Sequence, residues 1–294
     1  MMKTTQTIEL DYPLQSKPRY GWGQQAVHLQ LYTIINRRRA FYHHTLHTLL
    51  THYSAHYLTI ARYPETINQP AWINGSLPGL DAVALYGFIS LHRPQRYFEI
   101  GIGHSTRFAR QAICDHQLDT QITAIDPYPP PNIEAICDTL IQKPLEQLDL
   151  SLFNALEAGD ILFIDSSHRV FMNSDVTVIF LEILPQLKPG VIVEFHDIAL
   201  PLDYPPQWAD KYYSEQYLLA AYLLAEGKRF DIILPNAFIT LDNELSQIMT
   251  PLWRQLNGEQ QIDMRTKLND NFSDKPQFGD IVDTHGSSFW MVIN

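Results

Sequence analysis

Two pairs of aspartate and histidine each follow a short apolar segment of the chain. Asp165 and His168 follow one of these segments, within the sequence Ile-Asp-Ser-Ser-His. His196 and Asp197 follow the other. An imidazole beside a carboxylate can remove a proton from a hydroxyl group at neutral pH. We therefore expect these four residues to be catalytic, with His168 as the general base and the two aspartates orienting it.

The same residues allow a second kind of chemistry. Carboxylate oxygens are ligands that Mg²⁺ prefers, and Asp165 and Asp197 can supply them. A bound metal would lower the pKa of a coordinated hydroxyl group and orient it. His196 stands where a further carboxylate would make a better magnesium site, so a Mg²⁺ site at the two aspartates and a metal-free site both stay open. The alternative to both is that these polar residues only cap strands and helices.

A turn that contains two glycines lies earlier in the chain. It follows an apolar segment that ends in Glu99, and it contains Gly101 and Gly103. Glycines let the backbone turn tightly and come close to a ligand. Ser105 then opens a segment with helical spacing, whose first amide groups are free to meet polar ligand groups. The pattern predicts a cofactor crevice at the carboxyl end of a strand, as in doubly wound α/β folds.

The residues around this turn indicate which cofactor fits. Asp126 follows the next apolar segment, about 20 residues beyond the glycines, where such folds carry the acid that holds a ribose. Thr106 replaces the third glycine of the dinucleotide pattern. A carboxylate at Glu99 repels a pyrophosphate but attracts an ammonium or sulfonium group. We therefore predict S-adenosylmethionine rather than NAD. The predicted cofactor-binding residues are Glu99, Gly101, Gly103, Ser105, Asp126 and Asp165.

The elements that position these residues alternate from about residue 90 onward. Short apolar segments separated by helical ones predict a parallel sheet covered on both faces, that is, an α/β Rossmann-like fold. The predicted strands are Tyr97–Ile100, Gln121–Ile125, Ile161–Ile164, Val191–Phe195, Phe230–Leu234 and Phe289–Ile293. Residues 1–80 are predicted to be a helical extension, with one helical pattern over 26–60, and residues 81–294 the main domain, with an insertion near 241–285.

Composition narrows the possible partners. Of 294 residues, 45% are hydrophobic, which suffices for a sizeable core, and the net charge of −11 disfavours binding to a nucleic acid. The one basic run, residues 37–39, is expected to be a solvated helix face. We find no apolar segment long enough for a membrane span and no signal-peptide pattern. Together with two cysteines that we expect to be reduced, this predicts a cytoplasmic protein with a small-molecule substrate.

A loop and helix start after Asp197 are predicted either to cover the crevice or to be only a helix opening. As a lid, this segment would turn four polar residues toward the substrate. They are Asp203, Tyr204, Glu215 and Gln216.

Together these residues resemble class I S-adenosylmethionine-dependent methyltransferases. Within that class, the chain is similar to macrocin-type sugar O-methyltransferases and cephalosporin-hydroxylase-like proteins. The resemblance covers roughly residues 80–227 and the last strand, near 287–290. The residues from Glu99 to Gly103 resemble the first motif of the class, and Asp126 its ribose-binding acid. The sequences around Asp165 and Asp197 resemble the signatures of strands four and five.

The resemblance implies a seven-stranded sheet whose last strand runs antiparallel. In macrocin-type members, the aspartate that matches Asp165 and an acid pair at the next strand end hold magnesium, and the histidine that matches His168 is the base. This chain departs from that pattern, because His196 replaces one acid. The implied function is transfer of a methyl group to a small molecule, at a hydroxyl group. An NAD-linked oxidoreductase and a cofactor-binding protein without turnover are the alternatives. The extension is expected to face the substrate or to form a homodimer.

Overall fold

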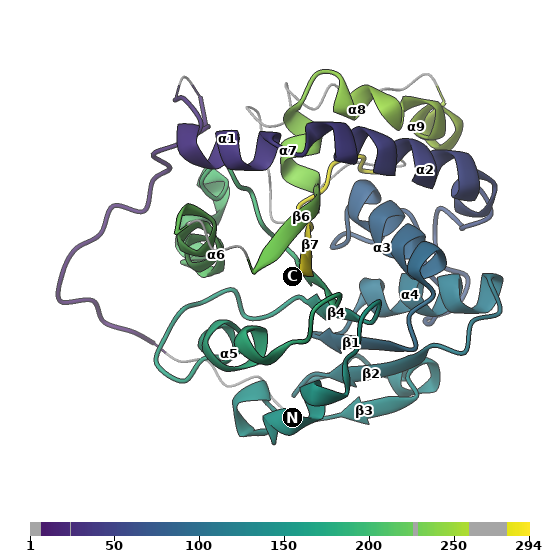
Figure 1. Ribbon diagram of the computed structural model, residues 1–294, viewed down its shortest axis with the longest axis horizontal. Helices are drawn as coiled ribbons and strands as arrows, with labels where there is room; N and C mark the ends of the chain where they lie inside the picture. Colours follow the sequence, from purple (N-terminus) through teal and green to yellow (C-terminus); the bar gives the residue numbers. More distant parts are fainter. Residues whose placement is uncertain (1–6, 24, 226–228, 259–280) are drawn as a thin grey trace.

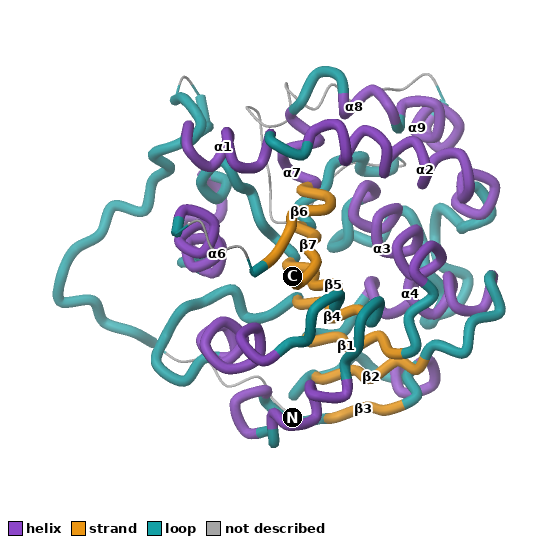
Figure 2. Tube along the Cα trace, viewed as in Figure 1, coloured by secondary structure: helices purple, strands orange, loops and turns teal. Residues whose placement is uncertain are grey.

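The computed structural model describes residues 7–23, 25–225, 229–258 and 281–294. From residue 96 onward, strands and helices alternate and build one central sheet with helices around it (Figures 1 and 2). The strands are β1 (Arg96–Ile100), β2 (Gln121–Ile125), β3 (Thr139–Ile141), β4 (Ile161–Ile164), β5 (Ile192–Phe195), β6 (Phe230–Pro235) and β7 (Phe289–Ile293). The helices are α1 (Leu29–Asn36), α2 (Arg39–Tyr57), α3 (Gly79–His92), α4 (His104–Asp115), α5 (Asp175–Val178), α6 (Glu215–Leu224), α7 (Asn236–Leu241), α8 (Leu245–Ile248) and α9 (Thr250–Asn257).

The sheet has the strand order β3-β2-β1-β4-β5-β7-β6. Strands β1 to β5 pair in parallel, whereas β7 runs antiparallel to both β5 and β6. This confirms the predicted α/β fold with seven strands and a reversed last strand. The strand order changes direction between β1 and β4, and open α/β sheets bind ligands at the carboxyl ends of the strands at such a point.

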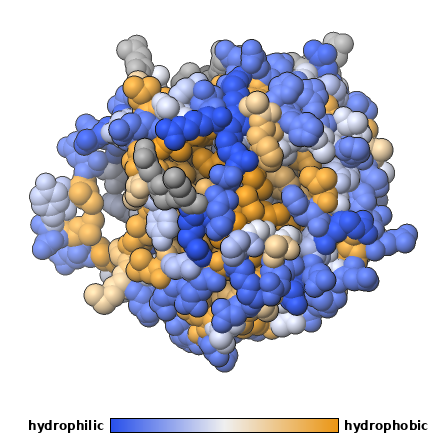
Figure 3. Space-filling view, viewed as in Figure 1, coloured by the Kyte–Doolittle hydropathy of each residue, from blue (hydrophilic) through white to orange (hydrophobic). Residues whose placement is uncertain are grey.

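The predicted strands all occur, with bounds that differ by no more than a residue at either end. The sequence analysis missed β3, because this strand has three residues and only partial burial. By contrast, β4 and β5 are buried along their whole length, as expected for parallel strands covered on both faces. Hydrophobic residues are visible in the middle of the face seen in Figure 3, framed by hydrophilic ones.

Helix α3 is apolar on all sides, and the residues from Gly79 to Ser90 are buried. A helix of this kind is stable only inside a core. Helix α3 lies against α4, which starts directly after the glycine turn. Asp81 is the acidic residue in the first turn of α3, and it is completely buried. The packing of α3 therefore brings a carboxylate into the interior.

The N-terminal helices pack onto the sheet domain. Helix α2 lies beside α8 and β6, and α1 lies beside α6 (Figure 1). Leu46, Leu49 and Tyr57 of α2 belong to the same hydrophobic core as the strands. The extension thus shares a core with the sheet, while its predicted role in substrate binding or dimerisation stays a prediction. Part of the predicted insertion, residues 259–280, lies outside the described residues.

The helical pattern predicted over 26–60 corresponds to two helices, α1 and α2, which a turn at Arg37 and Arg38 separates. The arginine run is also not a simple solvated face. Arg38 forms an ion pair of 2.6 Å with Asp231 on β6, and Arg39 pairs with Asp242 after α7. Through these ion pairs, the two arginines connect the start of α2 to the edge strand β6 and to the residue that follows α7.

The segment before α1 also contacts the sheet domain, at the loop that follows β5. The Asp203 carboxylate accepts hydrogen bonds from the backbone of Arg19 and Tyr20, and the Trp22 indole donates to the Asp203 carbonyl over 2.8 Å.

Within the described ranges, none of the helices has both the length and the apolar character needed to cross a membrane.

Two matched leucine substitutions test whether α2 is part of the main core. Leu46 is fully buried, whereas Leu58, at the end of α2, is 38% exposed. We expect Leu46→Ala to lower the free energy of unfolding of the whole domain by about 2–5 kcal/mol, since it leaves a cavity. Leu58→Ala should change it by less than about 1 kcal/mol. Urea unfolding followed by circular dichroism measures both, and an equal effect of the two variants would contradict the shared core.

Candidate active site

The turn after β1 is held close to the end of β4. Gly101 has a φ of +82°, and its amide donates to the Ile125 carbonyl over 2.9 Å. A Cβ atom at Gly101 would overlap the carbonyl oxygen of Asp165. The Asp165 amide in turn donates to the Ile100 carbonyl over 2.8 Å. Only glycine fits at position 101, for both conformation and space.

Gly103 has a different role in the same turn. Its φ of −175° is open to any residue, and a Cβ atom there would meet no atom within 4 Å. Next to it, the Asp126 carboxylate accepts hydrogen bonds from the amides of Ile102, at 3.1 Å, and Tyr128, at 2.6 Å. The structure therefore brings Gly101, Gly103 and Asp126 together around one turn, with space beside Gly103.

Glu99 lies beneath this turn rather than at an open surface. Its side chain is fully buried, and it accepts hydrogen bonds from Thr106 at 2.6 Å and from Tyr97 at 3.1 Å. Burial raises the pKa of Glu99 to about 7, against the opposing effect of hydrogen bonds from Ser105, Thr106 and Tyr97. Ser105 is likewise buried. A positive charge above the turn would favour the ionised form of Glu99, because opposite charges attract through the low-dielectric interior.

His168 lies between three carboxylates. Its Nδ1 atom is 2.8 Å from Glu215, and its Nε2 atom is 3.2 Å from Asp165 and 3.7 Å from Asp197. Burial lowers the pKa of His168, but the hydrogen bonds to Asp165 and Glu215 and the nearby negative charges outweigh it and raise the pKa to about 10. The imidazole is therefore protonated at neutral pH.

His196 lies between carboxylates in the same way. Its Nδ1 atom is 3.4 Å from Asp197, and its Nε2 atom is 3.5 Å from Asp81. Burial opposes protonation, but the close contacts with these two aspartates raise the pKa of His196 well above its usual value. The same contact with His196 outweighs the effect of burial on Asp197 and holds the pKa of that carboxyl far below its usual range.

The four predicted catalytic residues thus meet, and two further carboxylates complete the group. We call it the His–Asp cluster: Asp81, Asp165, His168, His196, Asp197 and Glu215. The sequence analysis missed Asp81, although a single acid in an otherwise apolar helix is an unusual feature that points to a buried partner.

Of the two alternatives predicted for the segment after Asp197, the structure favours a helix opening over a lid that turns polar side chains toward the substrate. Glu215 and Gln216 are fully buried, and Asp203 and Tyr204 nearly so. Glu215 binds His168, and the Gln216 side chain accepts a hydrogen bond from the Ala199 amide. These residues fasten the loop after β5 to α6 instead of facing a ligand.

The Mg²⁺ site that the sequence left open at Asp165 and Asp197 does not fit this arrangement. Among the residues that the structure describes, no group of three or more His, Cys, Asp or Glu side chains is arranged to hold a metal ion. The physical reason is that both aspartates already face cations. Each lies within 3.9 Å of a ring nitrogen of His168 and of His196, whose pKa values are raised. The two imidazolium groups supply the positive charge that a metal would bring.

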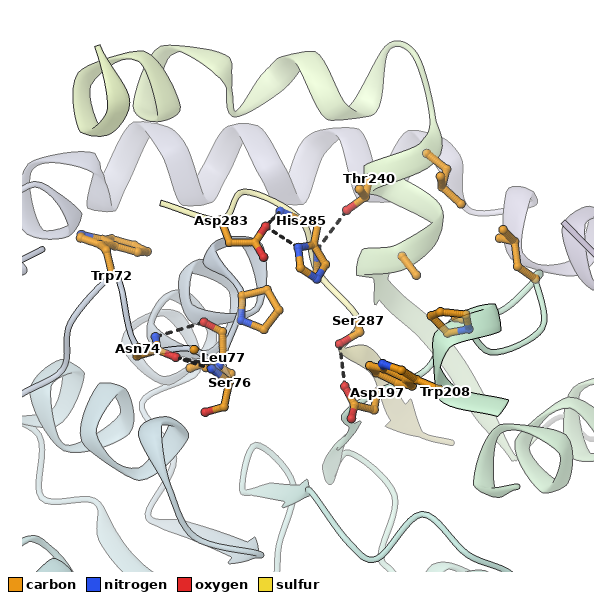
Figure 4. Close-up of a pocket in the computed structure, with 18 of the residues that line it drawn as sticks. Trp72, Asn74, Ser76, Leu77, Asp197, Trp208, Thr240, Asp283, His285 and Ser287 are labelled. Atoms are coloured by element: carbon orange, nitrogen blue, oxygen red, sulfur yellow. Dashed lines mark hydrogen bonds and ion pairs between the residues drawn. The ribbon is translucent and has the colours of Figure 1, made fainter. Parts of the chain in front are cut away.

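A cavity of about 320 Å³ adjoins the His–Asp cluster. Asp197 lines it, and the Asp197 carboxylate accepts a hydrogen bond from the Ser287 hydroxyl over 3.2 Å (Figure 4). The indole rings of Trp22, Trp72 and Trp208 also line the cavity. The sequence analysis missed these tryptophans, because aromatic residues near the N-terminus predict a core as readily as a binding site.

Two matched glycine substitutions test the turn. Gly101→Ala is expected to lower the free energy of unfolding by more than about 1 kcal/mol, because the new methyl group overlaps a carbonyl oxygen at a positive φ. Gly103→Ala should leave it within about 0.5 kcal/mol of the wild type. Thermal unfolding measures this difference. Equal stability of the two variants would contradict the close contact between Gly101 and Asp165.

The raised pKa of His168 makes a prediction about stability and pH. A folded-state pKa near 10, above the ordinary 6.5, stabilises the folded protein fully below pH 6.5, and this contribution disappears as the pH rises toward 10. We expect His168→Gln to destabilise the protein most below pH 6.5 and least near pH 10. Urea unfolding across this range tests it, with His44→Gln, an exposed residue of α2, as the control. A cost of His168→Gln that does not vary with pH would contradict the ion-paired imidazolium.

Comparison with known proteins agrees with this geometry. Residues 98–198 match a family described as "Methyltransferase domain", and the match runs from β1 past Asp197. An uncharacterised protein of Archaeoglobus fulgidus is 33% identical over 116 residues, which cover 36% of this chain and 52% of that protein. The match therefore spans about half the length of this relative.

Similar solved structures include two that contain S-adenosylhomocysteine (SAH). A Podospora anserina methyltransferase is 15% identical, with 68% of this chain and 89% of that chain covered and a TM-score of 0.34. An O-methyltransferase from Bacillus cereus is 15% identical, with 64% and 82% covered and a TM-score of 0.36. A putative O-methyltransferase from Klebsiella pneumoniae is 14% identical, with 64% and 80% covered and a TM-score of 0.36.

Because these TM-scores are below 0.5, the assignment rests on the family match and on the strand order. The matched residues contain the glycine turn, Asp126, Asp165, His168 and the residues after β5. The sheet has the reversed last strand that the resemblance implied. Residues 98–198 of this chain therefore match a methyltransferase domain, within a sheet that has the topology implied by the resemblance to class I methyltransferases.

Proposed function

We propose that this protein transfers the methyl group of S-adenosylmethionine to a hydroxyl group of a small molecule. One observation supports this most strongly. Asp197 belongs both to the His–Asp cluster at the carboxyl edge of the sheet and to the wall of the aromatic cavity. A cofactor at the glycine turn and an acceptor in the cavity would therefore meet at this residue, and methyl transfer requires the two reacting atoms to be held in line.

The residues at the turn suit the proposed cofactor. A carboxylate accepts two hydrogen bonds at once, so Asp126 would hold the two ribose hydroxyls. The backbone around Gly101 and Gly103 would lie against the methionine end, with Asp165 at its border. The negative charge of Glu99, beneath the turn together with Ser105, would favour the positive charges of the ligand. When bound, S-adenosylmethionine supplies an electrophilic methyl group.

His168, the residue that the sequence predicts to be the base, can act as a base only after it has lost its own proton. With a pKa near 10, His168 holds a proton at neutral pH and accepts one from a hydroxyl group only after losing its own. In the protonated form, His168 and His196 keep the Asp197 carboxylate ionised, and their ion pairs hold Asp165 and Asp197 in place. If His168 is the base, the rate of methylation will keep rising as the pH approaches 10.

Isothermal titration calorimetry tests the cofactor assignment. We expect SAH and S-adenosylmethionine to bind, and NADH, which an oxidoreductase would bind, to give no heat. Asp126→Ala should weaken SAH binding about tenfold to a hundredfold, since it removes hydrogen bonds to a charged group. Asp149→Ala is the matched control, because Asp149 caps a short helix at residues 150–155 and lies at no strand end of the site. Absence of SAH binding would overturn the proposed function.

A further inference from the structure

The aromatic cavity is built almost entirely outside the segment that matches the methyltransferase family. Among the described residues that line the cavity, Asp197 alone falls within residues 98–198. The other walls come from residues 22 and 72–78 of the N-terminal extension, from the loop after β5, from α7 and from the residues that precede β7. The matched segment thus contains the glycine turn, whereas the parts of the chain around it form the cavity.

One wall is the segment that carries Trp22, and it is held tightly against the loop after β5. The Asp203 amide donates to the Tyr20 carbonyl over 3.2 Å, and the Trp22 indole donates to the Asp203 carbonyl over 2.8 Å. Gly21 has a φ of +84°, and a Cβ atom there would overlap the Leu202 side chain. These contacts fix the Trp22 ring beside the cavity before any ligand binds.

A second wall is the loop at residues 72–78, which is held by its own hydrogen bonds. The Asn74 side chain donates to the Leu77 carbonyl over 3.1 Å, and it accepts hydrogen bonds from the amides of Ser76 and Leu77, at 3.0 and 2.8 Å (Figure 4). The Trp72 indole donates to the Tyr57 carbonyl over 3.1 Å. A ligand therefore does not have to order this loop, which lowers the cost of binding.

The two indoles offer ring carbons rather than hydrogen-bond donors to the cavity. The Nε1 hydrogens of Trp22 and Trp72 are both bonded to backbone carbonyls. The rings therefore contribute flat apolar surfaces, which aromatic rings pack against. Further apolar side chains line the cavity, among them Leu77, Leu202, Leu241 and Ile281. A volume of about 320 Å³ suits a small molecule of one or two rings.

Asp197 and Trp72 lie at different ends of the cavity. Figure 4 shows Asp197, bonded to Ser287, on the opposite side from Trp72. The contact with His196 outweighs the effect of burial and holds the pKa of Asp197 far below its usual range, so its carboxylate is ionised. A carboxylate accepts a hydrogen bond from a hydroxyl group. The cavity therefore favours a ligand whose hydroxyl group points to Asp197 and whose ring lies toward Trp72.

We propose that the N-terminal extension determines which acceptor this protein binds. Trp22 and Trp72 hold the flat ring system of a small aromatic molecule, whose hydroxyl group points to Asp197. This inference rests on the proposed function, in which the cavity receives the methyl acceptor. Because both tryptophans lie outside the matched segment, they set the acceptor specificity without changing the turn at which the cofactor binds.

Two probes of similar size but different shape test this proposal. 2-Naphthol is flat, whereas decahydro-2-naphthol carries its hydroxyl group on the same carbon skeleton with puckered rings. We expect 2-naphthol to bind the wild-type protein in equilibrium dialysis with SAH present. Trp22→Leu and Trp72→Leu should each weaken this binding about threefold to tenfold, since each removes a flat stacking surface. The same substitutions should change the binding of decahydro-2-naphthol less than about twofold, because leucine packs equally well against a puckered ring.

The control variant is Tyr12→Leu, which should leave the binding of both probes unchanged. Tyr12 is an aromatic residue of the same extension, but it is 74% exposed and does not line the cavity.

Two results would overturn the inference. One is no binding of 2-naphthol to the SAH-loaded protein. The other is a preference for 2-naphthol over decahydro-2-naphthol that stays the same in both tryptophan variants as in the wild type, since a general loosening of the fold weakens both probes alike. SAH calorimetry on the same preparations separates this failure from that of the proposed function. If SAH binds and the naphthol result is negative, the inference fails and the proposed cofactor stands. If SAH does not bind, the proposed function fails together with the inference that rests on it.

Discussion

The candidate site depends on a series of alternating carboxylates and imidazoles, most of which are buried. It runs from Asp81 on α3 through His196 to Asp197 and Asp165, and then through His168 to Glu215 on α6. Leaving a charge without its partner costs several kcal/mol when both are buried, so the buried members, Asp81, His168, His196 and Glu215, require their neighbours. The series links two helices to the ends of β4 and β5, and it therefore determines the shape of the carboxyl edge where a cofactor would bind.

The histidines of the cluster are more deeply buried than the aspartates. This differs from the expectation that aspartates lie behind a histidine and orient it. The side chains of both histidines are 5% exposed, whereas those of Asp165 and Asp197 are 43% and 21% exposed. The imidazolium groups thus lie behind the aspartates, and the carboxylates reach the surface. Such an edge attracts cationic groups, as the sulfonium and ammonium groups of S-adenosylmethionine require.

The sequence was informative wherever a local pattern defines the structure. Short β-branched and aromatic segments predicted the strands, and the turn at Gly101 followed from a pattern that needs glycine for both conformation and space. The convergence of Asp165, His168, His196 and Asp197 followed from parallel topology, because the carboxyl ends of neighbouring strands meet.

The rest depends on contacts between residues far apart in the chain, which no local pattern encodes. Asp81 is 115 positions before His196, its partner in the cluster. The sequence left open whether Glu215 faces a substrate or only opens a helix, because its burial against His168 follows only from the packing of α6. The protonation of the histidines is likewise a result of three-dimensional arrangement, since burial alone would have made them neutral. The aromatic cavity combines side chains from both ends of the chain.

A crystal structure of the protein with bound SAH tests the central claim most directly. The account predicts density along the turn beside Gly103, with the ribose oxygens within hydrogen-bond distance of the Asp126 carboxylate. It also predicts that the sulfur faces Asp197 and the aromatic cavity. Density for the ligand at another place, or a ligand whose sulfur points away from Asp197, would contradict it.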